Sequence, residues 1–295
     1  MTKKAKMLDN EIEKTLLIAQ RNEITEHLIY EKLSKSINDP HNKDVLKIIS
    51  NDELKHHNFW KKYTNIDIKP DKLKIWKYFL ISKILGLTFG IKLMERGEEK
   101  ALLTYEEISK FIPDARSIIR DEDEHEKHLI GLIDEERLRY ISSMILGLND
   151  ALVELTGTLA GLTLTLQNAQ VVAMVGLITG IAASLSMAAS EYLSTKSEED
   201  VKKPLKASVY TGSTYVLTVL FLIFPYLVFS NLYLCLGSTI LNAIIVIFAF
   251  TFYISVVKNI SFRKRFFEMI LISLGIAALT FIVGSLIRIF LNVEI

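Results

Sequence analysis

Asp52-Glu53-Leu54-Lys55-His56 and Asp121-Glu122-Asp123-Glu124-His125 are two copies of one short pattern in the polar half of this chain. Residues three apart on a helix project from one face, so each copy can offer a carboxylate and an imidazole to one metal ion. Two such copies predict two helices that together hold a two-metal centre.

The residues around both copies have apolar positions at helical spacing. They predict four helices, at about 8–36, 42–64, 72–111 and 114–140. Gly86 and Gly90 are places for a kink in the third helix, and the fourth is expected to lead directly into a membrane span. No run alternates with period two, so no strands are expected. A four-helix bundle is the simplest packing, and the fold class is all-α.

The first and third helices repeat one arrangement, in which Glu23 and Glu98 are each followed by a tyrosine seven residues later. One Glu from each of two helices, with Glu-x-x-His from each of the other two, is the ligand set of carboxylate-bridged di-iron bundles. The predicted metal ligands are Glu23, Glu53, His56, Glu98, Glu122 and His125, with Glu95 as a further candidate. The alternative is that these residues only form solvated faces of charged helices.

Other polar and aromatic residues of this half give weaker signals. Glu26 and His27 are offset from Glu23 and are expected to turn partly away. His57 and His128 could support the metal ligands from behind or be exposed, and exposure is the expectation. A stretch that starts at Ile75-Trp76 and runs to about residue 94 is more apolar than one bundle stripe requires. It either rests on the bilayer surface or is buried in the bundle.

Charge divides the chain into two parts. Roughly three quarters of the 35 basic and 34 acidic residues, and all six His residues, precede Ser142. The net charge of +1 gives no reason to propose a nucleic-acid partner.

The single Cys235 lies in an apolar run, which excludes a disulfide framework within the chain and a cysteine-based metal site. No signal peptide is expected.

Five apolar runs after residue 140 are long enough to span a bilayer, which needs ~20 residues. They lie at about 142–166, 170–193, 207–229, 232–257 and 268–291. The links after the second and fourth runs are rich in lysine and arginine, and the links after the first and third have none. The positive-inside rule therefore places the N-terminus in the cytoplasm and the C-terminus outside the cell membrane.

Two of these runs carry acidic residues, which are costly inside a membrane and usually line a polar path or a protein interior. Asp150 and Glu154 share a face of the first run, and Met187 and Glu191 share a face of the second. Carboxylates with a thioether suit Fe²⁺ better than Ca²⁺ or Mg²⁺. The alternative for Met187 is an ordinary core position.

Small residues recur at four-residue spacing in the first two runs, in Gly157-x-x-x-Gly161 and Gly176-x-x-x-Gly180. This spacing lets helix backbones approach closely. It could join helices within one chain or join two chains, and the sequence leaves both open.

Positions 1–140 resemble the rubrerythrin branch of the ferritin-like superfamily. The resemblance rests on Arg21-Asn22-Glu23-Ile24-Thr25-Glu26 through Tyr30 and on Ile48-Ile49-x-x-Asp52-Glu53-x-x-His56. It implies a di-iron centre on the ligand set given above. The cysteine-rich rubredoxin module of full rubrerythrins is absent from this chain.

Positions 141–295 resemble the vacuolar iron transporter family of Fe²⁺/Mn²⁺ exporters. The phrases that carry this are Gly147-Leu-Asn-Asp150-Ala-Leu-Val-Glu154 and Ser186-Met187-Ala-Ala-Ser-Glu191-Tyr192-Leu193-Ser194. The resemblance implies a translocation path through Asp150 and Met187, a homodimer, and export coupled to protons. The long acidic insert of the plant members is missing. The combination of both halves resembles the membrane-bound ferritin proteins of prokaryotes.

These features together predict a multi-pass exporter of Fe²⁺, with Mn²⁺ as a second candidate, whose cytosolic domain captures or senses the metal. The metal would pass to Glu191 and Met187, then to Asp150 and Glu154. The alternative from another functional class is a membrane-anchored di-iron oxidase or peroxidase. Ferroxidase or peroxidase activity in the ferritin-like domain is open in either case.

Overall fold

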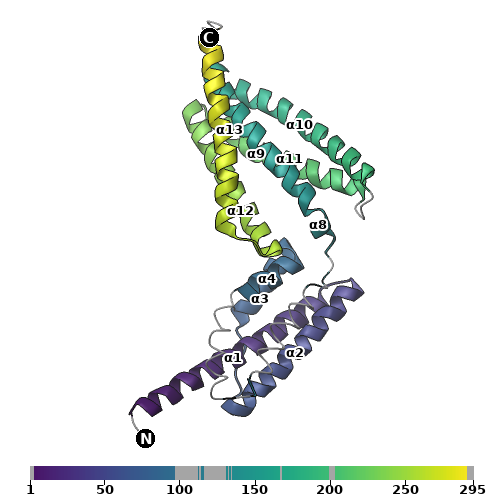
Figure 1. Cartoon of the computed structure of the whole chain (residues 1–295), viewed down its shortest axis with the longest axis vertical. Coiled ribbons are helices and arrows are strands. Elements are labelled where there is room, and N and C mark those ends of the chain that lie inside the picture. The colour runs from purple at the N-terminus through teal and green to yellow at the C-terminus, as the bar shows by residue number, and fades with distance from the viewer. Residues whose placement is uncertain are drawn as a thin grey trace. The chain divides into compact units, whose positions relative to one another are not determined.

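The computed structural model describes residues 3–96, 112, 114–115, 131, 133, 135–166, 168–198 and 203–290. Every regular element in these residues is a helix, as the sequence predicts. The chain divides into two compact units, Met1–Glu135 and Glu136–Ile295, whose helices are labelled in Figure 1.

The first unit is built on a pair of long helices, α1 (Lys3–Lys35) and α2 (Pro40–Thr64), which pack side by side (Figure 1). Asp39 ends the short link between them, and its side chain accepts a hydrogen bond from the backbone N–H of Asn42 at 2.8 Å. Pro40 stands in the first turn, where a missing N–H costs nothing. Helix α2 ends at Asn65, whose φ of 55° is left-handed.

Two shorter helices follow, α3 (Lys72–Leu85) and α4 (Leu87–Arg96). The side chain of Asp71 caps α3, accepting from two backbone N–H groups at 2.9 and 3.0 Å. Gly86, with φ 111°, separates α3 from α4. The predicted kink at Gly86 is therefore confirmed as a full break between two helices.

The core of this unit lies between α1, α2, α3 and α4. Its buried members are Ile29, Tyr30, Leu33, Val45, Leu46, Ile49, Tyr78, Leu87, Ile91, Met94 and Ile133. A smaller cluster on α1 and α2 contains Leu16, Ala19 and Trp60. Most of residues 97–134 lie outside the described part of the chain, so the complete four-helix bundle stays a prediction.

The predicted helix at 114–140 is wrong at its C-terminal end. Ile133 and Glu135 are not helical. The carboxylate of Glu135 accepts hydrogen bonds from the backbone N–H groups of Leu87 at 2.9 Å and Thr88 at 2.7 Å. These are the first N–H groups of α4, which have no partner inside their own helix. Glu135 thus caps α4 and does not extend a helix.

The second unit begins with the single turn α8 (Glu136–Arg139) and continues as five long helices. They are α9 (Ile141–Leu166), α10 (Ala169–Ser197), α11 (Pro204–Val228), α12 (Leu232–Lys258) and α13 (Phe262–Phe290). All five are long and apolar enough to cross a membrane, as predicted. The main differences are that α10 continues to Ser197 and α13 begins at Phe262.

Helix α9 is the centre of this unit, since it contacts α10, α11, α12 and α13. Close backbone approach explains several glycines. A Cβ on Gly147 would collide with the backbone carbonyl of Thr211, and a Cβ on Gly180 would lie 2.6 Å from the Val219 side chain, both on α11. A Cβ on Gly157 would lie 2.6 Å from Thr280 on α13. The small-residue spacing therefore joins helices within one chain.

Candidate metal centre and membrane path

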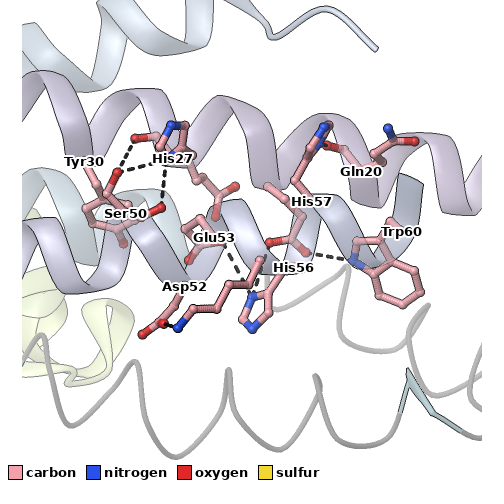
Figure 2. A network of polar contacts seen from close by, with 12 residues as sticks. Gln20, His27, Tyr30, Ser50, Asp52, Glu53, His56, His57 and Trp60 are labelled. Atoms are coloured by element: carbon pink, nitrogen blue, oxygen red, sulfur yellow. Dashed lines mark hydrogen bonds and ion pairs between the residues drawn. The ribbon is translucent and has the colours of Figure 1, made fainter. Parts of the chain in front are cut away.

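Three of the predicted ligands meet between α1 and α2. Glu23 lies on α1, and Glu53 and His56 lie three apart on α2, with one possible ligand atom of each within 4.8 Å of the others. The Nδ1 atom of His56 is 3.6 Å from Glu23 Oε2 and 4.0 Å from Glu53 Oε2. Figure 2 shows Glu53 and His56 in the network between the two helices. The structure thus brings half of a predicted two-metal ligand set together.

Both carboxylates of this group are buried, with 2% of Glu23 and 3% of Glu53 exposed. Two buried carboxylates side by side repel each other unless a proton or a cation neutralises them. Burial raises the pKa of the Glu23 carboxyl, but hydrogen bonds with His56, Glu53 and Trp60 and the charge of His56 outweigh it and hold the pKa below its usual value. Glu23 is therefore kept as a carboxylate, which is the form that binds metals. The donor set fits a divalent transition metal.

Trp60 is part of this arrangement, although no sequence pattern indicated it. Its side chain is fully buried, and its indole N–H donates to Glu23 Oε1 at 3.1 Å (Figure 2). The other oxygen, Oε2, is the one that lies nearest His56. The indole therefore fixes the rotation of the carboxylate and leaves one oxygen toward the centre.

Two histidines next to the group have structural partners. His57 is buried, so the prediction that it is exposed is wrong; its Nδ1 is 3.0 Å from the backbone carbonyl of Gln20 (Figure 2). His27 Nδ1 lies 2.7 Å from the carbonyl and 2.9 Å from the hydroxyl of Ser50. Both rings tie α1 to α2 and turn away from the carboxylates, as expected for His27.

The remaining ligand candidates divide into one described residue and three that are not. Tyr30, fully buried on α1, donates to Glu95 Oε1 on α4 at 3.0 Å. Glu95 does not belong to the group of ligand atoms within 4.8 Å. Glu98, Glu122 and His125 lie outside the described residues, as does His128, so their predicted positions are untested.

In the second unit, each predicted pair of path residues includes one carboxylate that is bonded to another helix. Tyr215 on α11 donates to Glu154 Oε2 at 2.7 Å. Ser143 on α9 donates to Glu191 Oε1 on α10 at 2.5 Å. Asp150 is half-buried, and Glu154 is exposed on the surface of the single chain.

Met187 is partly buried and packs against the apolar core of the second unit. This contact fits the ordinary core role as well as a role in the path. Close to Asp150, the buried side-chain oxygen of Asn149 has no hydrogen-bond partner within the described residues. An unbonded buried amide oxygen is rare and is an available ligand atom.

The profile of the VIT (vacuolar iron transporter) family matches residues 141–203. This stretch is similar to the VIT family, and the second unit that contains it (Glu136–Ile295) is called the VIT domain below. Neither the curated proteins nor the solved structures gave a match to the chain. The VIT match begins at Ile141, where α9 begins, and includes all four path candidates. With five helices able to span a membrane, it indicates a multi-pass membrane protein and suggests a transporter of metal ions such as iron or manganese.

Sequence reasoning missed three side chains that donate hydrogen bonds to carboxylates of the first unit and of the VIT domain. Trp60, Ser143 and Tyr215 each donate to a predicted ligand or path residue. Each donor is far from its acceptor in the sequence, so spacing along one helix could not reveal it. A tyrosine in the middle of an apolar span was the one available signal, because a buried phenol needs a partner.

Proposed function

We propose that this chain exports Fe²⁺ across the cell membrane, with Mn²⁺ as a further candidate substrate. We also propose that its first unit is a ferritin-like domain that captures the metal. The observation that carries the proposal is the buried group Glu23, Glu53 and His56, on a chain whose following helices match a VIT domain. Carboxylate oxygens with an imidazole nitrogen suit Fe²⁺ and Mn²⁺.

Metal capture would use ligands on α1 and α2 together with the residues predicted to complete the ligand set. Glu23, Glu53 and His56 would hold one metal. Glu98, Glu122 and His125 would form the second half, with Glu95 placed by its hydrogen bond from Tyr30. A di-iron centre bound there would supply redox chemistry. The protein's own contribution is a dry, pre-oriented set of anionic oxygens.

The path through the membrane would run from Glu191 and Met187 to Asp150 and Glu154. Each charge inside a span costs about 2.5–3.5 kcal/mol on insertion scales, so a span that only anchors the chain has no use for it. The hydrogen bonds of Ser143 to Glu191 and of Tyr215 to Glu154 support this path, because they hold carboxylates in fixed positions in the VIT domain.

Two further features of the proposal concern protons and a second copy of the chain. Protons entering from outside would protonate Asp150 or Glu154 and so release the cation outward. Glu154 is exposed on a single copy, and an exposed carboxylate facing lipid is costly. A homodimer that covers this face removes the cost. The cytoplasmic position of the N-terminus follows from the positive-inside rule.

The test is transport by the full chain in sealed vesicles. A trapped metal-sensitive dye and a trapped pH dye report Fe²⁺ or Mn²⁺ entry and counter-flow of protons. We expect Asp150→Asn to abolish transport, and Thr179→Ala to leave it unchanged, because the Thr179 hydroxyl bonds only to carbonyls of its own helix. Normal transport by the Asp150→Asn protein would refute the proposed path.

The competing function is an oxidase or peroxidase anchored by the membrane helices. It uses the same buried group, and no observation in the VIT domain favours it. Stopped-flow absorbance of the Fe²⁺-loaded full chain mixed with O₂ or peroxide distinguishes the two. Rapid multiple turnover with an electron donor, without metal transport in vesicles, would favour the enzyme.

A further inference from the structure

Helix α3 exposes a row of large apolar side chains along one face. The exposed fractions are 84% for Leu73, 55% for Trp76, 49% for Leu80 and 71% for Ile84. At 3.6 residues per turn these positions fall within about 80° of arc, so they form one continuous stripe. The opposite face carries the buried Tyr78 and Ser82, which pack into the core of the first unit.

The charged residues of α3 are all basic. The helix carries Lys72, Lys74, Lys77 and Lys83 and contains no acidic residue. Lys74 pairs with Glu26 at 3.2 Å, which leaves the other three beside the stripe. Helical geometry places Lys77 on one side of it and Lys72 and Lys83 on the other. An apolar stripe with lysine on both sides is the face that an interfacial helix presents to a membrane, and the far side of α3 is apolar because it packs into the core of the first unit.

Trp76 has a position suited to such an interface. Its ring is open to solvent on the exposed stripe, while the Lys32 ammonium lies 3.0 Å from the ring centroid. Tryptophan is enriched at the headgroup level of membranes, where one side is apolar and the other polar. The cation on Lys32 adds positive charge next to the stripe.

We infer that α3 docks on the surface of the bilayer that the VIT domain spans, with anionic lipid headgroups as its partner. The helix has 14 residues, about 21 Å at 1.5 Å per residue, so it is too short to cross and would lie flat. The first unit is covalently joined to α9, which keeps this bilayer at high effective concentration.

A protein partner fits the stripe less well than lipid does. Lysine is depleted at protein–protein interfaces, where aromatic and arginine residues are enriched. Three lysines around a small apolar stripe instead complement the negative surface potential of a leaflet that contains anionic lipids. Docking would hold the first unit near the membrane whether or not metal is bound, so the inference does not depend on the proposed transport.

The test uses the two tryptophans that the full chain contains. The chain is placed in lipid nanodiscs with brominated acyl chains, made either with a third phosphatidylglycerol or with phosphatidylcholine alone. Bromine quenches only fluorophores that reach the lipid. Trp60 is fully buried and Trp76 is half exposed, so the difference between wild type and Trp76→Phe reports Trp76 alone.

Docking predicts strong quenching of Trp76 in the anionic discs and weak quenching in the neutral discs or at high salt. Lys72→Gln with Lys77→Gln should lower the ratio of docked to undocked protein about 30-fold, because each lysine near an anionic surface contributes a factor of about five. The matched control is Lys47→Gln with Lys62→Gln, two exposed lysines of α2.

Two results would overturn the inference, and neither depends on the lysine variants of α3. One is that Trp76 in anionic discs stays unquenched by bromine and open to acrylamide in the water. The other is that acrylamide is excluded while bromine still has no effect, since protein would then cover the stripe. That covering protein would be the VIT domain or a second copy of the chain.

Discussion

The two units of this chain differ in the polar side chains that join their helices. In the first unit, aromatic side chains donate to carboxylates on other helices, as Trp60 does to Glu23 and Tyr30 to Glu95. In the VIT domain, the buried Thr211 and Thr239 donate to backbone carbonyls of other helices, while Thr165 and Thr179 bond back to a carbonyl of their own helix. Such self-bonding satisfies a hydroxyl in an apolar environment without specifying a neighbour.

The carboxylates of the VIT domain depart from this local pattern. Glu154 and Glu191 both accept from a hydroxyl on a different helix. A carboxylate has no donor of its own and cannot be satisfied by its helix carbonyls. In both units, acids therefore accept hydrogen bonds from donors on other helices, and those donors mark the places where the fold positions a carboxylate.

Among the substitutions considered, Glu53→Gln should have the largest effect, and it should act on metal binding by the first unit. The change keeps the size of the side chain and removes one of two adjacent buried carboxylates. We expect metal affinity of the first unit to fall by more than the roughly 10–100-fold that loss of an outer hydrogen-bond partner costs. Under conditions where both carboxyls are ionised, the metal-free variant should melt at a higher temperature than the metal-free wild type, because the repulsion between them is removed.

Titration of the full chain with Fe²⁺ or Mn²⁺ and thermal melting measure both consequences of this change. Asp52→Asn is the matched control, since the neighbouring Asp52 carboxylate pairs with the exposed Lys55 at 2.6 Å. A Glu53→Gln protein with the metal content of the wild type would show that the buried group is structural.

The next effect in size is that of Trp60→Phe, which removes the indole donor and keeps an aromatic ring in the core. Glu23 Oε1 loses its 3.1 Å hydrogen bond, so the carboxylate can rotate. The expected loss of metal affinity is about 10–100-fold. Because that bond also lowers the Glu23 pKa, metal binding in the variant should weaken at a higher pH than in the wild type as acid is added.

Trp76→Phe serves as the control for Trp60→Phe, since Trp76 lies on the exposed face of α3. The same loss in both variants would attribute the effect to tryptophan content in general. A loss of folding stability in Trp60→Phe without any change in affinity or pH profile would leave Trp60 as a packing residue only.

Whether the sequence predicted a feature depends on how far apart along the chain the interacting residues lie. Apolar run length predicted five spanning helices, and helix spacing predicted that Glu53 and His56 share a face. Glycine tolerates positive φ, which predicted a kink at Gly86 or Gly90, but only packing could decide that the break is at Gly86 and that Gly90 lies within α4. The cap by Glu135 joins residues about fifty positions apart, so local pattern could not show it.

His57 illustrates a different kind of failure. Adjacent residues on a helix point about 100° apart, so His56 turned inward predicts a neighbour turned partly outward. The buried face of α2 is wide enough to include both because Gln20 on α1 offers a backbone carbonyl. Partners of this kind appear only once two helices are packed.

In the VIT domain, the packing between helices should dominate how a substitution changes folding stability. Gly147→Ala would place a methyl group against the Thr211 carbonyl, so α9 and α11 must move apart. Overpacking of this kind typically costs about 1–3 kcal/mol. Thermal unfolding in detergent should show the loss, while Gly237→Ala, with nothing within 4 Å of its Cβ, should not destabilise the protein.

The smallest effect is expected at the end of the first unit, from Glu135→Gln. Its carboxylate accepts from the N–H groups of Leu87 and Thr88 at the start of α4, where the helix dipole favours negative charge. Loss of the charge should cost about 0.3–1 kcal/mol, and the cost should be local to α4. Hydrogen exchange at Leu87 and Thr88 should accelerate by roughly two- to fivefold, while the membrane helices stay unchanged.

Glu136→Gln is the matched control: Glu136 pairs with Lys206, and the interaction with this lysine lowers the pKa of the Glu136 carboxyl. Because that pair belongs to the second unit, the control should leave the α4 amides unaffected, and faster exchange there would mean that Glu135 is not an independent cap.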